Sequence, residues 1–195
     1  MRIPAEERRE QLIAATVEIM RRQGVQGVTI RAIAKEANAP LAIVSYCFDG
    51  KDQIMDAAAE AWLRNFSRFS RDAPVHLGLR KAVESVAEGY WRALVEEPAN
   101  ILAEIEMILW ATRNAPESPL AAKIYPAYIM ELGNIFASAA MHSSEESRID
   151  IPLLVSSFLM IFDGAAIQYM TDPTTATPKT MYFMMIDALL TKTGL

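Results

Sequence analysis

Two residues of the sequence have types and a spacing that suit the binding of a cation. Glu106 and Trp110 lie four residues apart in the segment ILAEIEMILWATR, which places them on one face of a helix. A carboxylate beside an aromatic ring can hold a protonated or quaternary amine by charge and by a cation–π interaction. We therefore predict a small-molecule site whose lining also includes other aromatic residues, namely Tyr90, Trp91, Tyr125 and Tyr128.

The same residues admit two other interpretations. An apolar or aromatic effector suits a pocket that has mixed apolar and aromatic walls and few polar groups. Alternatively, the aromatic side chains belong to an ordinary core, and Glu106 pairs with Arg113 or faces solvent. The sequence leaves these interpretations open.

No residue pattern indicates an enzyme, a cofactor or a metal. The sequence lacks a glycine-rich phosphate loop, a His/Cys cluster with metal-ligand spacing and a Ser-His-Asp arrangement. Its two histidines, His76 and His142, both lie at breaks between helical segments, where we expect surface positions. A small helical enzyme with Glu106 or Asp163 as acid or base is the rival interpretation, although no second catalytic group stands at a defined spacing.

Composition indicates a cytoplasmic protein of one or two domains. The 195 residues are 52% hydrophobic, which suffices for a core and leaves apolar surface for a dimer interface or a ligand cavity. A single cysteine, Cys47, excludes an internal disulfide and fits a reducing compartment. We find no run of about 18 uncharged apolar residues and no apolar signal segment, so we expect no membrane partner.

Charge is distributed unevenly along the chain. Residues 1–51 hold eight basic and six acidic side chains, a net charge of +2, whereas residues 52–195 hold eleven and eighteen, a net charge of -7. A basic segment on an acidic body is typical of a small DNA-binding module attached to a larger domain. We therefore predict a DNA-binding domain in residues 1–51 and a ligand-binding and dimerisation domain in residues 52–195.

Helical periodicity runs through the whole sequence, and we predict an all-α fold of about nine helices. Apolar residues recur at spacings of three and four, and proline, glycine and polar clusters separate the runs. No segment shows the alternation of a strand. The predicted helices cover residues 4–23, 30–37, 40–47, 51–71, 77–96, 98–114, 118–141, 151–171 and 177–192.

Local signals predict a helix-turn-helix in residues 29–48. Thr29 is a suitable N-cap for the second helix, and Asn38 tolerates the left-handed conformation that ends it. The third helix is barely two turns long, which is enough for a recognition helix because the major groove curves away. Its expected inner side holds Ala39, Ile43 or Val44, and Phe48, and its expected outer side holds Leu41, Ala42, Ser45 and Tyr46. A plain helical hairpin within a bundle is the alternative.

Residues 8–55 resemble the N-terminal domain of the TetR family of bacterial transcriptional regulators. The resemblance rests on the ordered segments RREQLIAATVEIMRRQG, VTIRAIAKEA, ANAPLAIVSYCF and DGKDQI. The stretch LLVSSFLMIFDGAAIQYMTDP is similar to the dimerising end of the subgroup that includes the choline-sensing regulator of betaine synthesis. The resemblance implies a ligand-responsive repressor that a small molecule releases from a pseudo-palindromic operator in double-stranded DNA.

The resemblance also implies which residues contact DNA. The residues that would contact phosphates, or bases at the edge of the site, are Thr29, Arg31 and Lys51. Those that would enter the major groove are Leu41, Ala42, Ser45, Tyr46 and Cys47. The sequence departs from the family pattern at Asn38, where glycine is usual, and at Ser45, where tyrosine is usual. Few side chains for bidentate base reading remain. A helical small-molecule-binding protein or enzyme of the same fold, without sequence-specific DNA binding, is therefore the alternative.

The last two predicted helices are apolar over more of their circumference than one subunit needs. Two such pairs related by a two-fold axis would form a four-helix bundle, and the resemblance implies the same homodimer. The expected dimer face consists of Leu154, Phe158, Ile161 and Ala165 on the first helix and Met181, Met185 and Leu189 on the second. Burial inside one subunit is the alternative.

Overall fold

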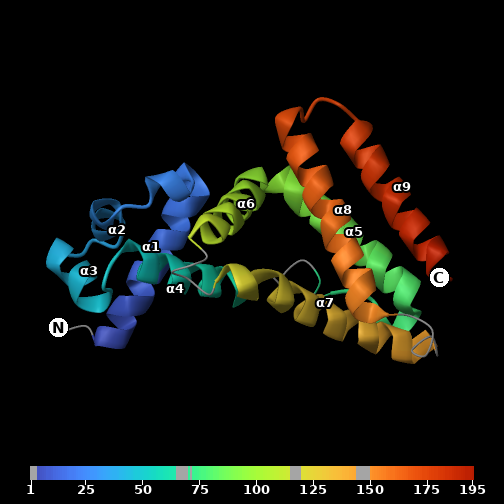
Figure 1. Cartoon of the computed structure of the whole chain (residues 1–195), viewed down its shortest axis with the longest axis horizontal. Helices are drawn as coiled ribbons and strands as arrows, with labels where there is room; N and C mark the ends of the chain where they lie inside the picture. Colours follow the sequence, from blue (N-terminus) through green and yellow to red (C-terminus); the bar gives the residue numbers. More distant parts are fainter. Residues whose placement is uncertain (1–3, 65–69, 71, 115–119, 144–149) are drawn as a thin grey trace. The chain divides into compact units, whose positions relative to one another are not determined.

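The expected all-α fold is confirmed by the computed structural model (Figure 1). The structure describes residues 4–64, 70, 72–114, 120–143 and 150–195. Within these ranges the regular elements are nine α-helices and two short 3-10 helices, with no strand. The elements are α1 (Ala5–Gln23), η1 (Val25–Gly27), α2 (Ile30–Glu36), α3 (Leu41–Cys47), α4 (Lys51–Arg64), η3 (Val75–Leu77), α5 (Leu79–Glu96), α6 (Pro98–Arg113), α7 (Ala121–Ser143), α8 (Ile151–Thr171) and α9 (Thr177–Lys192).

Most helix bounds agree with the sequence prediction to within two residues. The bounds of α8 and α9 are those predicted. The described part of α4 ends at Arg64, and the rest of the predicted helix to residue 71 lies largely outside the described residues. The predicted start of the seventh helix at residue 118 also lies outside them, and α7 is described from Ala121.

The chain forms two compact units that interleave along the sequence. Unit 1 consists of Met1–Asn65 and Ala99–Tyr125, and unit 2 consists of Phe66–Pro98 and Pro126–Leu195. Helix α6 therefore belongs with α1 to α4, because its side chains contact the end of α1. The functional boundary that we predict at residue 51 stays a prediction, since the compact units describe packing and not function.

In unit 1, α1 is the helix against which α2, α3 and α4 pack. Its apolar stripe, predicted from Leu12, Ala15 and Ile19, is buried. The helix ends at Gly24, whose φ of 70° is a conformation that glycine adopts without the steric cost of a Cβ. The long helix thus serves as the support on which the two short helices are placed.

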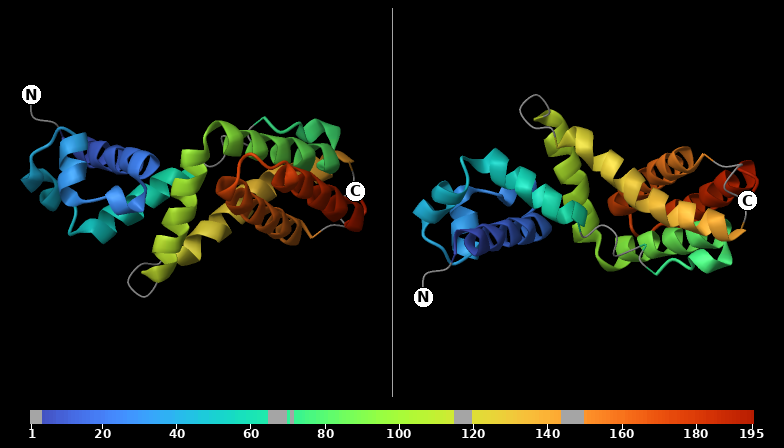
Figure 2. Two further views of the ribbon diagram at one scale, coloured as in Figure 1. Left: turned by 90° about the horizontal axis from the view of Figure 1, so that it is seen from above. Right: turned by 90° about the horizontal axis from the view of Figure 1, so that it is seen from below.

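In unit 2, α8 and α9 form an antiparallel hairpin, and α5 packs against α9 (Figures 1 and 2). The interior of this unit is aromatic. The Tyr90 ring meets the rings of Phe158 and Phe162 edge to face, with centroids 5.5 and 4.9 Å apart. The Trp91 ring lies 5.4 Å from that of Tyr182. Such ring pairs contribute about 0.5–1.5 kcal/mol each beyond the burial of their area.

Helix α8 is the one helix of the described part that is long and apolar enough to cross a membrane by length and composition. Seven of its side chains are buried, among them Leu154 and Phe158. A core helix of a helical protein has the same composition, so this property assigns no membrane role.

Candidate DNA interface and effector residues

Helices α2 and α3 form a helix-turn-helix whose turn has the two features predicted from the sequence. The Oγ1 of Thr29 accepts a hydrogen bond from the backbone N–H of Ala32 at 3.1 Å, which confirms the N-cap of α2. Asn38 has a φ of 47° and is the one non-glycine residue of the described ranges with a positive φ. The backbone N–H of Ala39 donates to the carbonyl of Ala34 at 2.9 Å and closes the turn.

The two sides of α3 differ in the way that a recognition helix requires. On the inner side, Val44 and Phe48 are 0% and 3% exposed. On the outer side, Leu41 and Tyr46 are 48% and 78% exposed, and Ala42 and Ser45 are also exposed. The chain therefore presents an apolar and hydroxyl-bearing face that it does not use for its own packing.

Arg9 on α1 holds the end of α3 and was missed by the sequence analysis. Its Nη1 donates to the backbone carbonyl of Cys47 at 3.3 Å, and its guanidinium lies 4.2 Å from the centroid of the Phe48 ring. A cation favours the negative C-terminal end of a helix, and the ring adds a cation–π contact. No local pattern could reveal these contacts, because the partners lie almost 40 positions apart in the sequence.

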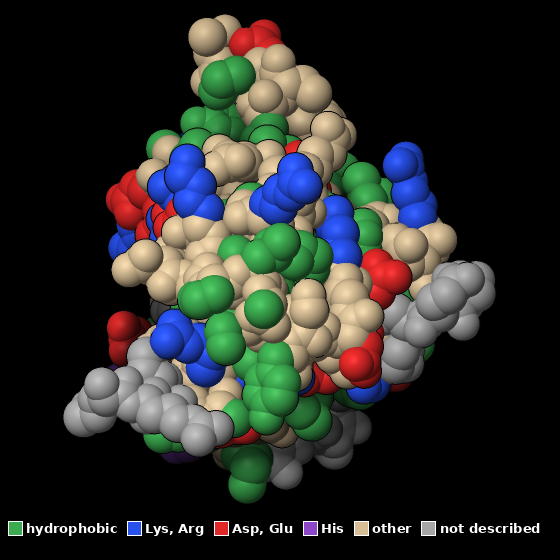
Figure 3. Space-filling view, turned by 90° about the vertical axis from the view of Figure 1, so that its left-hand side faces the viewer, with side chains coloured by type: hydrophobic (Ala, Val, Ile, Leu, Met, Phe, Trp, Pro, Cys, Tyr) green, Lys and Arg blue, Asp and Glu red, His purple; other side chains and the backbone are tan. Residues whose placement is uncertain are grey.

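Basic side chains lie on the helices that precede and follow α3 in the chain. Arg31 is exposed on α2, and Lys51 is the half-exposed first residue of α4. Figure 3 shows the end of the molecule that carries α2 and α3, where apolar side chains occupy the middle and Lys and Arg side chains lie around them. Cations of this kind contact phosphates and fix the register of a protein on DNA, while the central side chains face the bases.

The residues predicted to bind an effector divide between the two units. Glu106, Trp110 and Tyr125 belong to unit 1, and Tyr90, Trp91 and Tyr128 belong to unit 2. The last three are buried, and the rings of Tyr90 and Trp91 pack on rings of α8 and α9. This is the packing of a core, as the alternative interpretation held, so an effector role for these residues stays a prediction.

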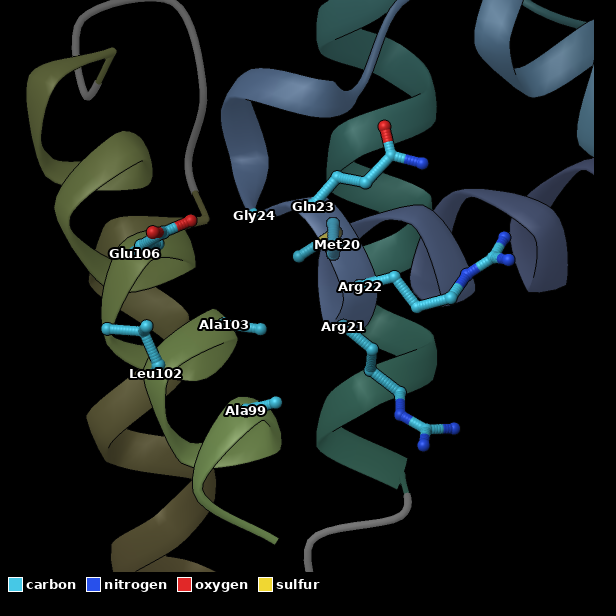
Figure 4. A pocket seen from close by; sticks show the side chains of 9 residues that line it. All are labelled: Met20, Arg21, Arg22, Gln23, Gly24, Ala99, Leu102, Ala103 and Glu106. Carbon is cyan, nitrogen blue, oxygen red and sulfur yellow. The ribbon is translucent and has the colours of Figure 1, made fainter. Parts of the chain in front are cut away.

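Glu106 has a partner that the sequence did not indicate. The backbone N–H of Val25 donates to its Oε2 at 2.7 Å. Within the described part of the chain, no ion pair joins Glu106 to Arg113. Figure 4 shows the carboxylate directed from α6 toward Gly24 at the end of α1. The Glu106 carboxylate, which we predicted to face a cation, thus accepts a hydrogen bond from the turn that leads into α2.

A groove of about 330 Å³ lies beside this contact, between the end of α1 and the first turns of α6 (Figure 4). Its lining consists of Met20, Arg21, Arg22, Gln23, Gly24, Ala99, Leu102, Ala103 and Glu106. None of the five aromatic residues predicted to bind an effector lines it.

The predicted dimer face needs a correction on α8. Leu154, Phe158 and Ala165 are buried within the single chain, so they do not form an outer face. Because apolar residues of α8 lie on both its buried and its exposed side, periodicity alone did not distinguish the two sides. Its exposed large apolar residues are Leu153, Met160 and Ile167, and those of α9 are Met181, Met184 and Met185. Two of the three predicted α9 residues, Met181 and Met185, are therefore exposed.

Comparisons with known proteins agree with this geometry. Residues 12–58 match the sequence model of the tetR family of bacterial regulatory proteins. The chain is 34% identical over 196 residues to the HTH-type nicotine-responsive transcriptional repressor HdnoR of Paenarthrobacter nicotinovorans, and the match covers 100% of both chains.

Solved structures share the fold. One is the multidrug binding protein EbrR complexed with ethidium, with a TM-score of 0.73, 22% identity and coverage of 94% of this chain and 98% of that one. Another is a putative TetR-family transcriptional regulator from Rhodococcus sp., with a TM-score of 0.72, 17% identity and coverage of 94% and 97%.

Proposed function

Because this chain belongs to the TetR family of bacterial transcriptional regulators, we propose that it is a ligand-responsive repressor that binds operator DNA through α2 and α3. The observation that carries the proposal is the division of α3 into a buried side and an exposed one. The proposed site of action is the cytoplasm, where the operator DNA lies. No part of this function needs a catalytic group or a cofactor.

The proposed DNA contacts follow from the exposed residues. Arg31 and Lys51 neutralise phosphates on the two sides of the groove, and Thr29, the N-cap of α2, lies two residues before Arg31. Leu41 and Ala42 contact thymine methyl groups, and Ser45 and Tyr46 offer hydroxyls to base edges or phosphates. This set favours thymine at the contacted positions over a guanine read by a bidentate arginine.

Salt dependence of DNA binding tests this proposal. The purified protein, an Arg31→Ala, Lys51→Ala variant and a Lys81→Ala control are titrated against the DNA that flanks the protein's own gene at two salt concentrations. Each lost phosphate contact reduces the slope of log affinity against log salt by about 0.9, so the double variant should lose about 2 per subunit, or about 4 for a dimer on its operator. Lys81 is an exposed cation of α5 in unit 2, and its removal should leave the slope unchanged. A double variant with the slope of the control would overturn the proposed contacts.

We further infer that the repressor acts as a homodimer through the exposed apolar residues of α8 and α9. Leu153, Met160 and Ile167 are seven residues apart, or about two turns, so they lie along one side of α8. Gly164 lies on the same side, and a Cβ there would meet no atom within 4 Å, which leaves room for a close approach of a second helix. Two α8–α9 hairpins would then form a four-helix bundle.

The proposed effector is a small hydrophobic amine. This class is supported by the names of similar proteins: one relative is nicotine-responsive, and one neighbouring structure holds ethidium. Nicotine and choline are the two probes. They distinguish a hydrophobic amine from choline, the effector that the similarity to choline-sensing regulators implies. Release of the protein from DNA by nicotine and not by choline would support a hydrophobic amine. Release by choline alone would support the choline-sensing subgroup, and release by neither would remove both classes.

The proposed mechanism is a shift between two populations of the dimer. In one population the two recognition helices are about 34–36 Å apart, the distance of one turn of DNA, and bind the two half-sites of a pseudo-palindrome. The effector binds the other population better, with a coupling free energy of about 1–3 kcal/mol, and so weakens DNA binding.

A further inference from the structure

We propose that Glu106 is a positioning residue for DNA binding, because its carboxylate holds the turn between α1 and α2 through the backbone N–H of Val25. This inference rests on the proposed DNA-binding function. It gives Glu106 a role in placing α2, in contrast to the role in cation binding that the sequence suggested.

The hydrogen bond to Glu106 satisfies a backbone N–H group in the turn after α1. Gly24, with a φ of 70° and a ψ of 179°, turns the chain away from the axis of α1. In η1 the N–H of Gly27 donates to the carbonyl of Gly24, and the N–H of Val28 donates to the carbonyl of Val25. The N–H of Val25 has Glu106 Oε2 as its acceptor at 2.7 Å, and Val25 is buried. A buried N–H without an acceptor is unfavourable, so the carboxylate stabilises this turn.

No other group of the described residues explains why a carboxylate lies here. The carbonyl groups at the end of α1 carry a partial negative charge, which disfavours an anion. Arg21 pairs with Glu18 at 3.1 Å, and Arg22 pairs with Glu18 at 3.2 Å and with Glu36 at 2.5 Å. Figure 4 shows both arginine side chains directed away from Glu106. The N–H of Val25 is thus what holds the carboxylate at this place.

A second polar contact joins the same two helices. The Nε of Arg21 donates to Oδ1 of Asn100 at 2.7 Å, and Asn100 is only 6% exposed. Asn100 and Glu106 are six residues apart on α6, so the helix is held to the end of α1 at two points. Val25 is the first residue of η1, and only the rest of η1 and the fully buried Val28 lie between it and the N-cap Thr29. Fixing Val25 therefore fixes the start of α2.

Gly24, the residue before Val25, leaves room for the Glu106 carboxylate. A Cβ at Gly24 would collide with Oε2 of Glu106, and the positive φ of Gly24 disfavours any other residue. The carboxylate therefore occupies the space that a Cβ at position 24 would need, in addition to the positive φ by which glycine ends α1.

A double-mutant cycle tests the role of Glu106 in DNA binding. Glu106→Ala removes the acceptor, and Val25→Pro removes the donor at the first position of η1, where the N–H takes no part in the 3-10 hydrogen bonds. Each single variant should lower the affinity for the flanking DNA about tenfold, since a hydrogen bond to a charged group is lost, and the double variant should lower it no further. Losses that add independently would overturn the proposal.

Glu106→Gln and amide exchange complete the test. Glutamine keeps an acceptor oxygen, so Glu106→Gln should retain affinity within about twofold of the wild type. Hydrogen exchange at the Val25 amide should be faster in Glu106→Ala and close to wild type in Glu106→Gln and in Glu88→Ala, which removes an exposed carboxylate of α5. Circular dichroism at the assay temperature confirms that each variant is folded.

If Val25→Pro does not fold, the contrast between Glu106→Ala and Glu106→Gln still decides the question. Equal affinities and equal exchange rates in these two variants would overturn the role of Glu106. A wild-type protein that does not bind DNA would instead overturn the proposed function, and the exchange rates would still test the contact itself.

Discussion

Unit 1 and unit 2 share one kind of contact that holds their helices and differ in a second kind. In unit 1, polar side chains bind backbone groups at helix ends: Thr29 at the start of α2, Arg9 at the end of α3 and Glu106 at the end of α1. In unit 2, aromatic rings from α5, α8 and α9 meet edge to face in the interior. Asp150 caps the start of α8 in unit 2 as Thr29 caps α2 in unit 1, so the interior ring pairs are what distinguish the described part of unit 2 from that of unit 1.

The largest effect that this comparison predicts is the loss of an interior ring in unit 2. Phe158→Ala should lower the free energy of unfolding by about 3–5 kcal/mol, because the ring is fully buried and contacts two other rings. Urea denaturation followed by circular dichroism measures the change. Met130→Ala, an exposed truncation on α7, should stay within about 0.5 kcal/mol of the wild type. Equal effects of the two substitutions would show that ring packing is not what stabilises unit 2.

The next effect concerns the outer side of the same hairpin. Met160→Glu combined with Ile167→Glu should weaken dimerisation about 100-fold or more, because two carboxylates would be buried without partners in the proposed interface. Sedimentation velocity over a range of concentrations measures the dissociation constant. The control Leu77→Glu places a carboxylate at an exposed apolar residue of η3 and should not alter it. An unchanged dimer in the double variant would place the interface elsewhere.

A smaller effect is expected at the cap of α2. Thr29→Ala should cost about 1 kcal/mol of stability, because the N–H of Ala32 loses its acceptor. It should also reduce DNA affinity, since the start of α2 lies in the proposed interface. Thr29→Ser keeps the hydroxyl and should restore both properties, as measured by thermal unfolding and by DNA titration. A serine variant as impaired as the alanine one would argue against the cap.

The smallest predicted effect is a dependence of unit 2 on pH. The hydrogen bond from Lys81, followed by that from Arg80, lowers the pKa of Glu84 from its ordinary value of 4.5. A lowered pKa in the folded state means that the stabilisation is present above pH 4.5 and is lost as the pH falls through the folded value. Because Glu84 is about one third exposed, Glu84→Gln should cost at most about 1 kcal/mol at neutral pH. Urea titrations should show that this difference disappears in acid, and a difference that persists there would have another cause.

Signals within a few residues predicted unit 1 well. Thr29, Asn38 and Gly24 each act on their own backbone, so their types alone indicate where a helix starts or ends. The contacts of Glu106 and Arg9 were not predicted, because each partner lies far away in the sequence and the hydrogen-bonded partners are backbone groups, which have no residue type to recognise.

In unit 2 the helix bounds were predicted, whereas the buried side of α8 was not. Apolar residues lie on opposite sides of the helix, so the choice of Leu154 over Leu153 as an inner residue depends on α5 and α9 and not on local periodicity. Pro126 inside α7 is a further feature that local rules do not place, since a proline usually ends a helix. Here the boundary between the two compact units falls at that residue.

Footprinting of the protein on the DNA that flanks its own gene measures sequence-specific binding and two-fold symmetry together. We expect protection of two related half-sites in inverted orientation, with centres one helical turn, about 34–36 Å, or a multiple of it apart. Protection should disappear with Arg31→Ala, Lys51→Ala and persist with Lys81→Ala. Absence of protection by a folded dimer, or protection of a single site without symmetry, would contradict the proposed function.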